Sequence, residues 1–194
     1  MTRFGLLFFA LVTGLGSCHL VAKSPEKAFR RPVALAWTSD GLLAVANRDT
    51  GSVSLIEVEK RKVVGEFVVG KRLSSLSSLS GSHFLVATDE EANQLLLLES
   101  KGAMVSVRDR VAVPHSPVNA LVAGDNSFAV VASLWARQVS LIRVDLEQGV
   151  LSLERVTDLP FPPRLQWMDA AGGKLVLADA FSDKVAALSL PDLS

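Results

Sequence analysis

The residues best suited to bind a ligand lie in four short polar segments, each close behind an apolar stretch. The segments 47–49, 89–91, 135–137 and 179–183 contain Asn47, Arg48, Trp135, Arg137 and Asp179. Amide, guanidinium, carboxylate and indole groups together can form a polar ligand site with an aromatic wall. The pattern fits a second interpretation better, in which the amide and carboxylate fix their own turns. The arginines would then pair with acidic residues of neighbouring segments, and Trp135 would pack on its neighbour.

Other groups with chemical potential are scattered along the chain. The three histidines, His19, His83 and His115, do not have metal-ligand spacing. The acidic run 89–91 favours a solvated turn over a calcium loop, whose ligands come at alternate positions. No G-x-S-x-G motif marks a nucleophilic serine, and no C-x-x-C-H motif attaches a haem. The sequence therefore predicts no catalytic, metal-binding or cofactor-binding residue, and it favours a protein that is not an enzyme.

The composition limits the class of protein. The chain has 194 residues, of which 49% are hydrophobic, and its 20 basic side chains balance its 20 acidic ones. This is enough for one folded domain. A neutral chain without a basic stripe does not suit nucleic acid, whose binding depends on neutralising phosphates. No nucleic-acid partner is therefore expected.

The first 18 residues differ from the rest and predict an exported protein. Arg3 precedes an apolar run from Phe4 to Leu15, which has the length of a signal-peptide core and is shorter than a membrane span. Leu15-Gly-Ser-Cys18 resembles a bacterial lipobox, in which the cysteine is lipidated and becomes the mature N-terminus. Cleavage near Ala22 and an uncleaved anchor are the alternatives. We expect a signal peptide and lipobox over 1–18 and a tether over 19–31. Lipid on Cys18 would hold the protein to a membrane in the periplasm or at the cell surface.

An apolar segment recurs four times and sets the positions of the polar residues. Its copies are Leu43–Ala46, Phe84–Ala87, Ala129–Ala132 and Leu175–Ala178, each followed by a polar stretch and a second apolar strand. The final alanines of the copies are 41, 45 and 46 residues apart. Short strands with a period of about 40–45 residues are typical of β-propeller blades, small sheets that stack around an axis. The polar turns should then share one rim of the propeller.

Turn residues divide each repeat into strands. In the first repeat we expect strands at 33–37, 42–46, 52–58 and 63–69. The inner strand of the second repeat is expected at 76–79. The predicted fold is all-β, with four-stranded antiparallel meanders that form an incomplete propeller over 32–194, after the signal segment. It has three full blades and a partial fourth, at about 32–72, 73–117, 118–163 and 164–194. Its open end faces would make the chain associate, and further blades downstream would make it monomeric.

The segment Leu43–Val58 resembles the YVTN-type repeat of bacterial β-propeller proteins. Asn47, Gly51, Val53 and Ile56 match the family pattern, while Glu57 replaces the usual aspartate. The later copies, 131–142 and 177–188, look like blades of exported propellers that often precede a c-type cytochrome domain. The resemblance implies the N-terminal portion of a propeller of this exported kind.

Two functions are compatible with these features. The first is an exported, membrane-tethered binding or scaffold module that presents its rim to a protein, a glycan or a small molecule. The alternative is the N-terminal part of a periplasmic oxidoreductase linked to a c-type cytochrome, whose haem domain lies downstream or on a partner chain. The first is favoured because the sequence lacks a haem motif. A continuation into further blades and a C-x-x-C-H motif would favour the second.

Overall fold

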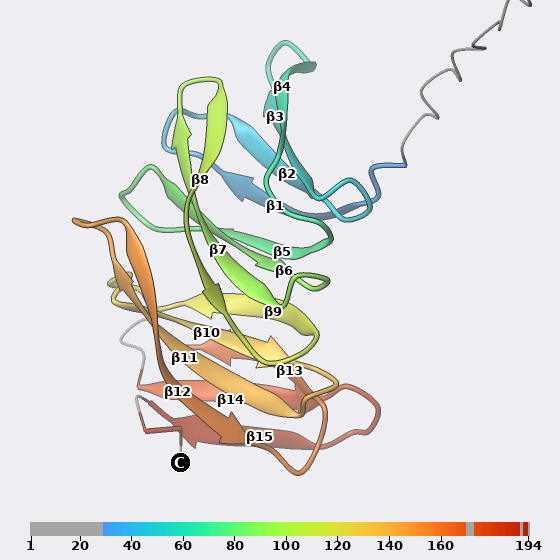
Figure 1. The fold of residues 1–194 in the computed structure, drawn as a ribbon, viewed down its shortest axis with the longest axis vertical. Coiled ribbons are helices and arrows are strands. Elements are labelled where there is room, and N and C mark those ends of the chain that lie inside the picture. The colour runs from blue at the N-terminus through green and yellow to red at the C-terminus, as the bar shows by residue number, and fades with distance from the viewer. Residues whose placement is uncertain (1–28, 170–172, 191, 194) are drawn as a thin grey trace, which may run out of the picture.

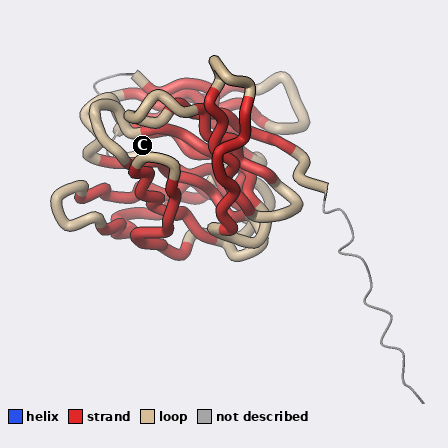
Figure 2. The backbone as a smooth tube through the Cα atoms, turned by 90° about the horizontal axis from the view of Figure 1, so that it is seen from above, coloured by secondary structure: helices blue, strands red, loops and turns tan. Residues whose placement is uncertain are grey.

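The structure is a computed structural model that describes residues 29–169, 173–190, 192 and 193. The predicted signal segment with Cys18, and the tether up to residue 28, lie outside these residues. The described part of the chain consists of strands and loops, without a helix (Figure 2). Its strands form four sheets, stacked from the N-terminal sheet at the top to the C-terminal sheet at the bottom of Figure 1.

Three sheets have four strands each. The first contains β1 (Pro32–Trp37), β2 (Leu43–Asn47), β3 (Ser52–Glu57) and β4 (Lys62–Val68). The second contains β5 (Leu73–Ser78), β6 (Phe84–Asp89), β7 (Gln94–Lys101) and β8 (Met104–Ala112). The third contains β9 (Pro117–Val122), β10 (Phe128–Ser133), β11 (Gln138–Asp145) and β12 (Val150–Asp158). The fourth sheet, within the described residues, contains β13 (Pro163–Met168), β14 (Lys174–Asp179) and β15 (Val185–Ser189).

Each sheet is an antiparallel meander whose strands pair in chain order. This confirms the predicted fold class, with three four-stranded blades and a partial fourth. The strands of the first blade lie within one residue of the predicted ones. In the second blade β5 begins three residues earlier than predicted, because Leu73 pairs with Asp89 across an irregularity in the ladder. The third and fourth inner strands begin at Pro117 and Pro163, one residue before the predicted boundaries.

The turn after the second strand has the same length in every blade and so defines corresponding residues. Four residues lie between the members of each closing pair, which are Asn47 and Ser52, Asp89 and Gln94, Ser133 and Gln138, and Asp179 and Lys184. The preceding residues are Ala46, Thr88, Ala132 and Ala178, which are 42, 44 and 46 residues apart. The expected anchor Ala87 is therefore one residue out of register. In a strand, such a slip moves a side chain to the opposite face of the sheet.

Apolar side chains fill the spaces between successive blades. Neighbouring residues of a strand point to opposite faces of a sheet. Ala44 and Ala46 of the first blade accordingly pack toward the second, while Leu85 and Ala87 of the second blade pack back toward the first. Similar clusters lie between the second and third blades and between the third and fourth. The described stack thus has three internal interfaces and two end faces.

Candidate binding rim

The turns after the second strands and the connections between blades lie along one edge of the stack, on the right in Figure 1. Backbone hydrogen bonds join each turn to the connection that enters its blade. The N–H groups of Arg48, Glu90, Leu134 and Ala180 donate to the carbonyl oxygens of Arg31, Arg72, Ser116 and Pro162, respectively. We call this edge, with turns 48–51, 90–93, 134–137 and 180–183, the rim.

Asn47 is a structural residue of the first turn. Its buried side chain donates from Nδ2 to Ser52 Oγ at 3.1 Å and to Ser54 Oγ at 2.8 Å. Ser52 Oγ also donates to Glu66 at 2.7 Å, and Arg30 binds the other oxygen of that carboxylate at 2.8 Å. The Ser52 hydrogen bond, and then Arg30, hold the pKa of Glu66 below its ordinary value, although partial burial opposes them. The side chain of Asn47 is therefore used within the first blade.

Asp89 holds the connection between the first and second blades. Its buried carboxylate accepts hydrogen bonds of 2.7–3.2 Å from the N–H groups of Lys71, Arg72, Glu91 and Ala92. A Cβ at Gly70 would lie 2.5 Å from Asp89 Oδ2, so only glycine leaves room for this contact. The prediction that Asp89 lies in a solvated turn is therefore wrong. Asp89 precedes Gln94 by the same number of residues as Asn47 precedes Ser52. This sequence separation is the signal that identifies Asp89 as the counterpart of Asn47.

Arg48 lies on the rim at the interface between the first two blades. It forms an ion pair with Glu90 of the second blade, and both side chains are partly buried. Farther along the turn, Glu91 approaches Arg72 at 4.0 Å. All three carboxylates of the acidic run 89–91 therefore contact groups of the protein itself.

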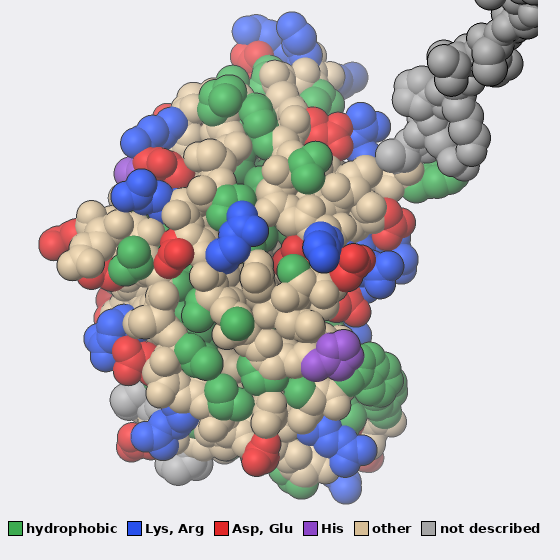
Figure 3. Space-filling view, in the orientation of Figure 1, with side chains coloured by type: hydrophobic (Ala, Val, Ile, Leu, Met, Phe, Trp, Pro, Cys, Tyr) green, Lys and Arg blue, Asp and Glu red, His purple; other side chains and the backbone are tan. Residues whose placement is uncertain are grey.

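An aromatic pair lies on the rim between the third and fourth blades. Trp135, in the turn between β10 and β11, stacks on Phe181, in the turn between β14 and β15. Their ring centroids are 5.6 Å apart and their planes differ by 24°. Despite this contact, Trp135 is 60% exposed and Phe181 is 67% exposed. Hydrophobic side chains are gathered at the same edge in the space-filling view, low on the right (Figure 3). The pair thus forms an apolar surface that is open to solvent.

Arg137 and Asp179 belong to the same two turns. Asp179 accepts hydrogen bonds from Ser182 Oγ at 2.7 Å and from the N–H of Phe181 at 3.0 Å. The Ser182 bond and then the Phe181 bond hold the pKa of Asp179 below its ordinary value, and the positive charges of Lys184 and Arg137 act in the same direction. Arg137 closes its own turn with a φ of 54°. The aromatic surface is therefore accompanied by charges of both signs.

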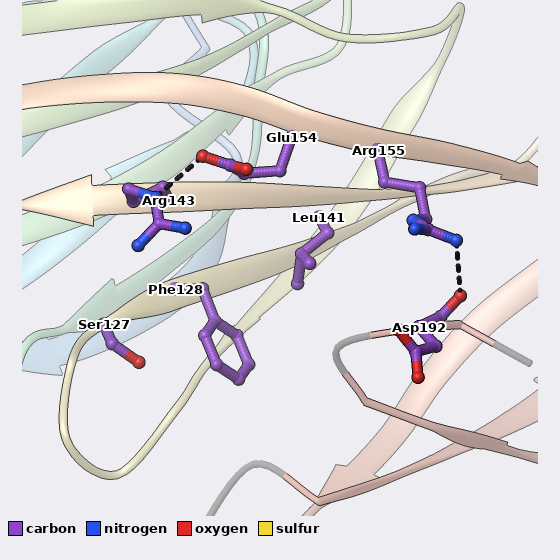
Figure 4. Close-up of a pocket in the computed structure, with 7 residues that line it drawn as sticks. All are labelled: Ser127, Phe128, Leu141, Arg143, Glu154, Arg155 and Asp192. Atoms are coloured by element: carbon purple, nitrogen blue, oxygen red, sulfur yellow. Dashed lines mark hydrogen bonds and ion pairs between the residues drawn. The ribbon is translucent and has the colours of Figure 1, made fainter.

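A hollow of about 360 Å³ lies between the third and fourth blades, at the end of β10 opposite the rim. Phe128 and Leu141 line it together with charged side chains (Figure 4). Arg143 is paired with Glu154 at 2.7 Å, and Arg155 donates to the carbonyl of Asp192 at 3.1 Å. Both arginines already have partners in the protein. The hollow is therefore a less suitable binding site for a charged ligand than the rim is.

The histidines of the described chain are separated from one another. His83 contacts Glu99 at 3.2 Å and lies beside the ring of Phe84, whereas His115 belongs to the connection that enters the third blade. Over the described ranges, no group of three or more His, Cys, Asp or Glu side chains is placed to hold a metal ion. Those ranges also contain no helix with the length and apolar character needed to cross a membrane.

Comparisons with known proteins identify the fold. No family model and no curated protein matches the sequence, but many solved structures match the fold. Hydrazine synthase of Kuenenia stuttgartiensis matches 90% of this chain with 50% of its own, at a TM-score of 0.72 and 16% identity. A putative 6-phosphogluconolactonase of Bacteroides fragilis aligns with 81% of this chain over 50% of its own length, with a TM-score of 0.72 and 18% sequence identity. The β-propeller domain of Cps50 (Swd1) from Myceliophteria thermophila aligns with 80% of this chain over 50% of its own length, with a TM-score of 0.66 and 10% sequence identity.

The stacked meanders and these likenesses define the protein as a β-propeller module. The chain spans about half the length of the solved structures it matches. Identities of 10–18% establish the fold and leave the function to be argued from the site.

Proposed function

We propose that this protein is an exported β-propeller module that binds a partner molecule through its rim. The observation that carries the proposal is the exposed stack of Trp135 and Phe181, with Arg137 and Asp179 in the same turns. Large aromatic side chains, with charged groups nearby to orient a partner, are typical of binding surfaces for proteins and for ring-shaped small molecules. The ligand is therefore a protein, a glycan or a small molecule with a flat apolar face.

The rim is divided between structural and binding parts. Asn47 and Arg48 already bond within the protein, to Ser52 and Ser54 and to Glu90. Trp135 and Phe181 contact each other and still expose more than half of their surfaces. We therefore assign ligand binding to the half of the rim formed by the third and fourth blades.

Photo-crosslinking from the rim tests this assignment. A photoreactive phenylalanine analogue at position 181 should capture a defined partner in the bacterial envelope. The same analogue at Met104, an exposed residue at the start of β8, should capture none. Trp135→Ala should weaken capture from position 181 at least tenfold. Equal capture from both positions, or capture unaffected by Trp135→Ala, would contradict binding at the rim.

Export and membrane attachment are proposed from residues 1–18. The apolar run and Leu15-Gly-Ser-Cys18 support a lipid on Cys18 that keeps the propeller at a membrane in the periplasm or at the cell surface. Mass spectrometry of the mature N-terminus should find a lipidated cysteine, and Cys18→Ser should release the protein from membranes. A mature terminus elsewhere, or unchanged retention of Cys18→Ser, would exclude the lipoprotein.

The alternative proposal, an oxidoreductase part linked to a c-type cytochrome, rests on the resemblance of the segments 43–58, 131–142 and 177–188 to exported propeller blades. It requires a haem domain that lies downstream or on a partner chain. Purification from the envelope under mild conditions, followed by a haem assay, separates the two proposals. Haem at near one equivalent would favour the alternative, and its absence would favour the binding module.

A further inference from the structure

Two serines of the third blade stand where the second blade has larger side chains. Ser133, the last residue of β10, corresponds to Asp89, because a turn of the same length separates each from the next strand. Ser140 of β11 corresponds to Leu96, because each pairs with the residue two positions before the end of the second strand. Both serines are fully buried. The third blade therefore buries two hydroxyl groups where the second blade has a carboxylate and an aliphatic side chain.

Both serines face the second blade. Residues two positions apart in a strand share one face of the sheet. Ser133 shares its face with Val131, and Ser140 shares its face with Ile142, and both of these apolar residues pack in the cluster between the second and third blades. The two serines thus belong to this interface, which we call the middle interface.

A third hydroxyl group comes from the connection that enters the third blade. Ser116 corresponds to Arg72 of the preceding connection, since the carbonyl of each accepts a hydrogen bond from the first residue of the next turn. The N–H of Arg72 donates to Asp89 at 3.1 Å. The corresponding residue Ser116 therefore lies next to Ser133, and it is only 2% exposed. The rim end of the middle interface contains all three hydroxyl groups, together with Ser140.

Two of the three hydroxyl groups have no hydrogen-bond partner in the described part of the chain. They are Ser116 Oγ and Ser140 Oγ. Ser133 Oγ donates to the carbonyl oxygen of Pro114 at 2.9 Å, and its lone pairs can still accept a hydrogen bond. A buried polar group without a partner destabilises a folded protein, and such groups commonly bond to ordered water. The hydroxyl groups of Ser116 and Ser140 therefore need a partner from outside the chain.

The first blade shows how a serine at the position of Ser140 is satisfied. Ser54 occupies this position and accepts a hydrogen bond of 2.8 Å from Asn47 Nδ2. Asn47 is the counterpart of Ser133. Serine lacks the carboxamide of asparagine, so Ser133 has no donor that reaches as far as the one in the first blade. A small polar molecule beside Ser133 can take the place of that amide.

The middle interface has room for such a molecule. Ser133 and Ser140 each have two fewer side-chain heavy atoms than their counterparts in the second blade, whereas Thr88, on the opposite side of the interface, has only two more than its counterpart Ala46. At these positions the middle interface therefore lacks two heavy atoms, a volume comparable with that of one water molecule. Hydroxyl groups both donate and accept and carry no charge, so the site suits a neutral molecule better than an ion.

We propose that the middle interface binds one buried water molecule through Ser116, Ser133 and Ser140. Ser116 and Ser140 donate to the water oxygen, and the water donates to Ser133 Oγ. These are three hydrogen bonds, the usual number for a buried water. The water joins the connection into the third blade to β10 and β11, as the carboxylate of Asp89 joins the connection into the second blade to β6. The site does not depend on the ligand of the rim.

A crystal structure of the mature full chain, at a resolution that shows ordered water, tests the site directly. One water should lie within hydrogen-bond distance of Ser116 Oγ and Ser140 Oγ. Direct hydrogen bonds of both hydroxyl groups to protein atoms, without a water between them, would overturn the proposal.

Alanine variants of the two serines test the site in solution. Ser116→Ala and Ser140→Ala each remove a hydrogen bond to the water, so each should raise the equilibrium constant of unfolding about fivefold in urea. The double variant should lose less than the sum, because the water has already lost a partner. Ser106→Ala, at an exposed position of β8, is the control and should change nothing. Without a bound water, alanine would only remove an unpaired hydroxyl group. Unchanged or higher stability of both variants, or strictly additive losses, would therefore overturn the site.

Ser133→Asn gives the third blade the side chain of the first and should displace the water. Its amide can donate to Ser140 directly, as Asn47 donates to Ser54. Ser116 then loses its partner, so Ser116→Ala should no longer reduce stability in this background. A loss that persists at about fivefold would show that Ser116 does not bond to this water, and the proposal would fail.

Discussion

Asp89 and Asp179 occupy the same position of two repeats but have different surroundings. Asp89 is buried and accepts hydrogen bonds from the connection that enters its blade, at Lys71 and Arg72. Asp179 bonds to Ser182 and Phe181 within its own turn, beside the stack with Trp135. One aspartate therefore joins two blades, whereas the other orders a turn that faces solvent.

The difference begins outside the two turns. Pro162 corresponds to Arg72, because its carbonyl accepts the hydrogen bond from the first residue of the next turn. Proline has no N–H, so the connection into the fourth blade cannot give Asp179 the bond that Arg72 gives Asp89. A carboxylate at this repeat position thus joins two blades only where the preceding connection can donate to it.

Removing the two carboxylates should separate their roles most clearly. Asp89→Ala leaves four backbone N–H groups without their acceptor at a buried site, so we expect a loss of about 2–4 kcal/mol in the free energy of unfolding. Asp179→Ala should change stability far less, because its partners can bond to water, but it should weaken rim binding. Urea unfolding of both variants measures the contrast. Equal losses of stability would show that the two aspartates have the same role.

The close approach of Gly70 to Asp89 offers a second way to disturb only one side of the comparison. A Cβ at this position would meet Asp89 Oδ2 at 2.5 Å. Gly70→Ala must displace the carboxylate from its donors, and we expect a cost of about 1–3 kcal/mol. Gly102→Ala is the control, since it has open space around it and should lose only about 1 kcal/mol from its positive φ. Urea unfolding ranks the two variants, and a larger loss for Gly102→Ala would contradict the proposed role of Gly70.

The blade architecture was predictable because its causes are local. Turn residues and short apolar strands recur with a nearly constant period, and each strand must fit between the turns that flank it. The register of the second blade was not predictable in the same way. Phe84-Leu-Val-Ala87 resembles Leu43-Ala-Val-Ala46, but the turn length shows that Thr88 is the residue that corresponds to Ala46. Counted from Ala87, the counterpart of Asn47 would be Thr88, whereas the turn length assigns that position to Asp89.

The sequence predicted the turns of the candidate site and the kind of contact that Arg48 and Trp135 make with a neighbouring blade, but not the individual partners. The repeat placed Arg48 and Trp135 at the rim, whereas their partners Glu90 and Phe181 come from neighbouring blades. Which side chains meet across a blade interface depends on the packing of two sheets and on details such as Pro162. Single-sequence patterns contain the turn positions but not these distances.

The smallest expected effect is a pH dependence confined to the turn of Asp179. The Ser182 hydrogen bond, and after it the Phe181 bond, lower the pKa of this carboxyl in the folded protein. Its contribution to stability is therefore fully present above the ordinary aspartate pKa, about 3.9, and is lost as the pH falls through the lowered folded value. The melting temperature of the wild type should exceed that of Asp179→Asn slightly near pH 6, and the difference should shrink toward zero in acid. Melting curves from pH 6 down to about pH 2 measure it. A difference that grows on acidification would mean that the folded protein raises this pKa, and the hydrogen-bonded turn would then not be the cause.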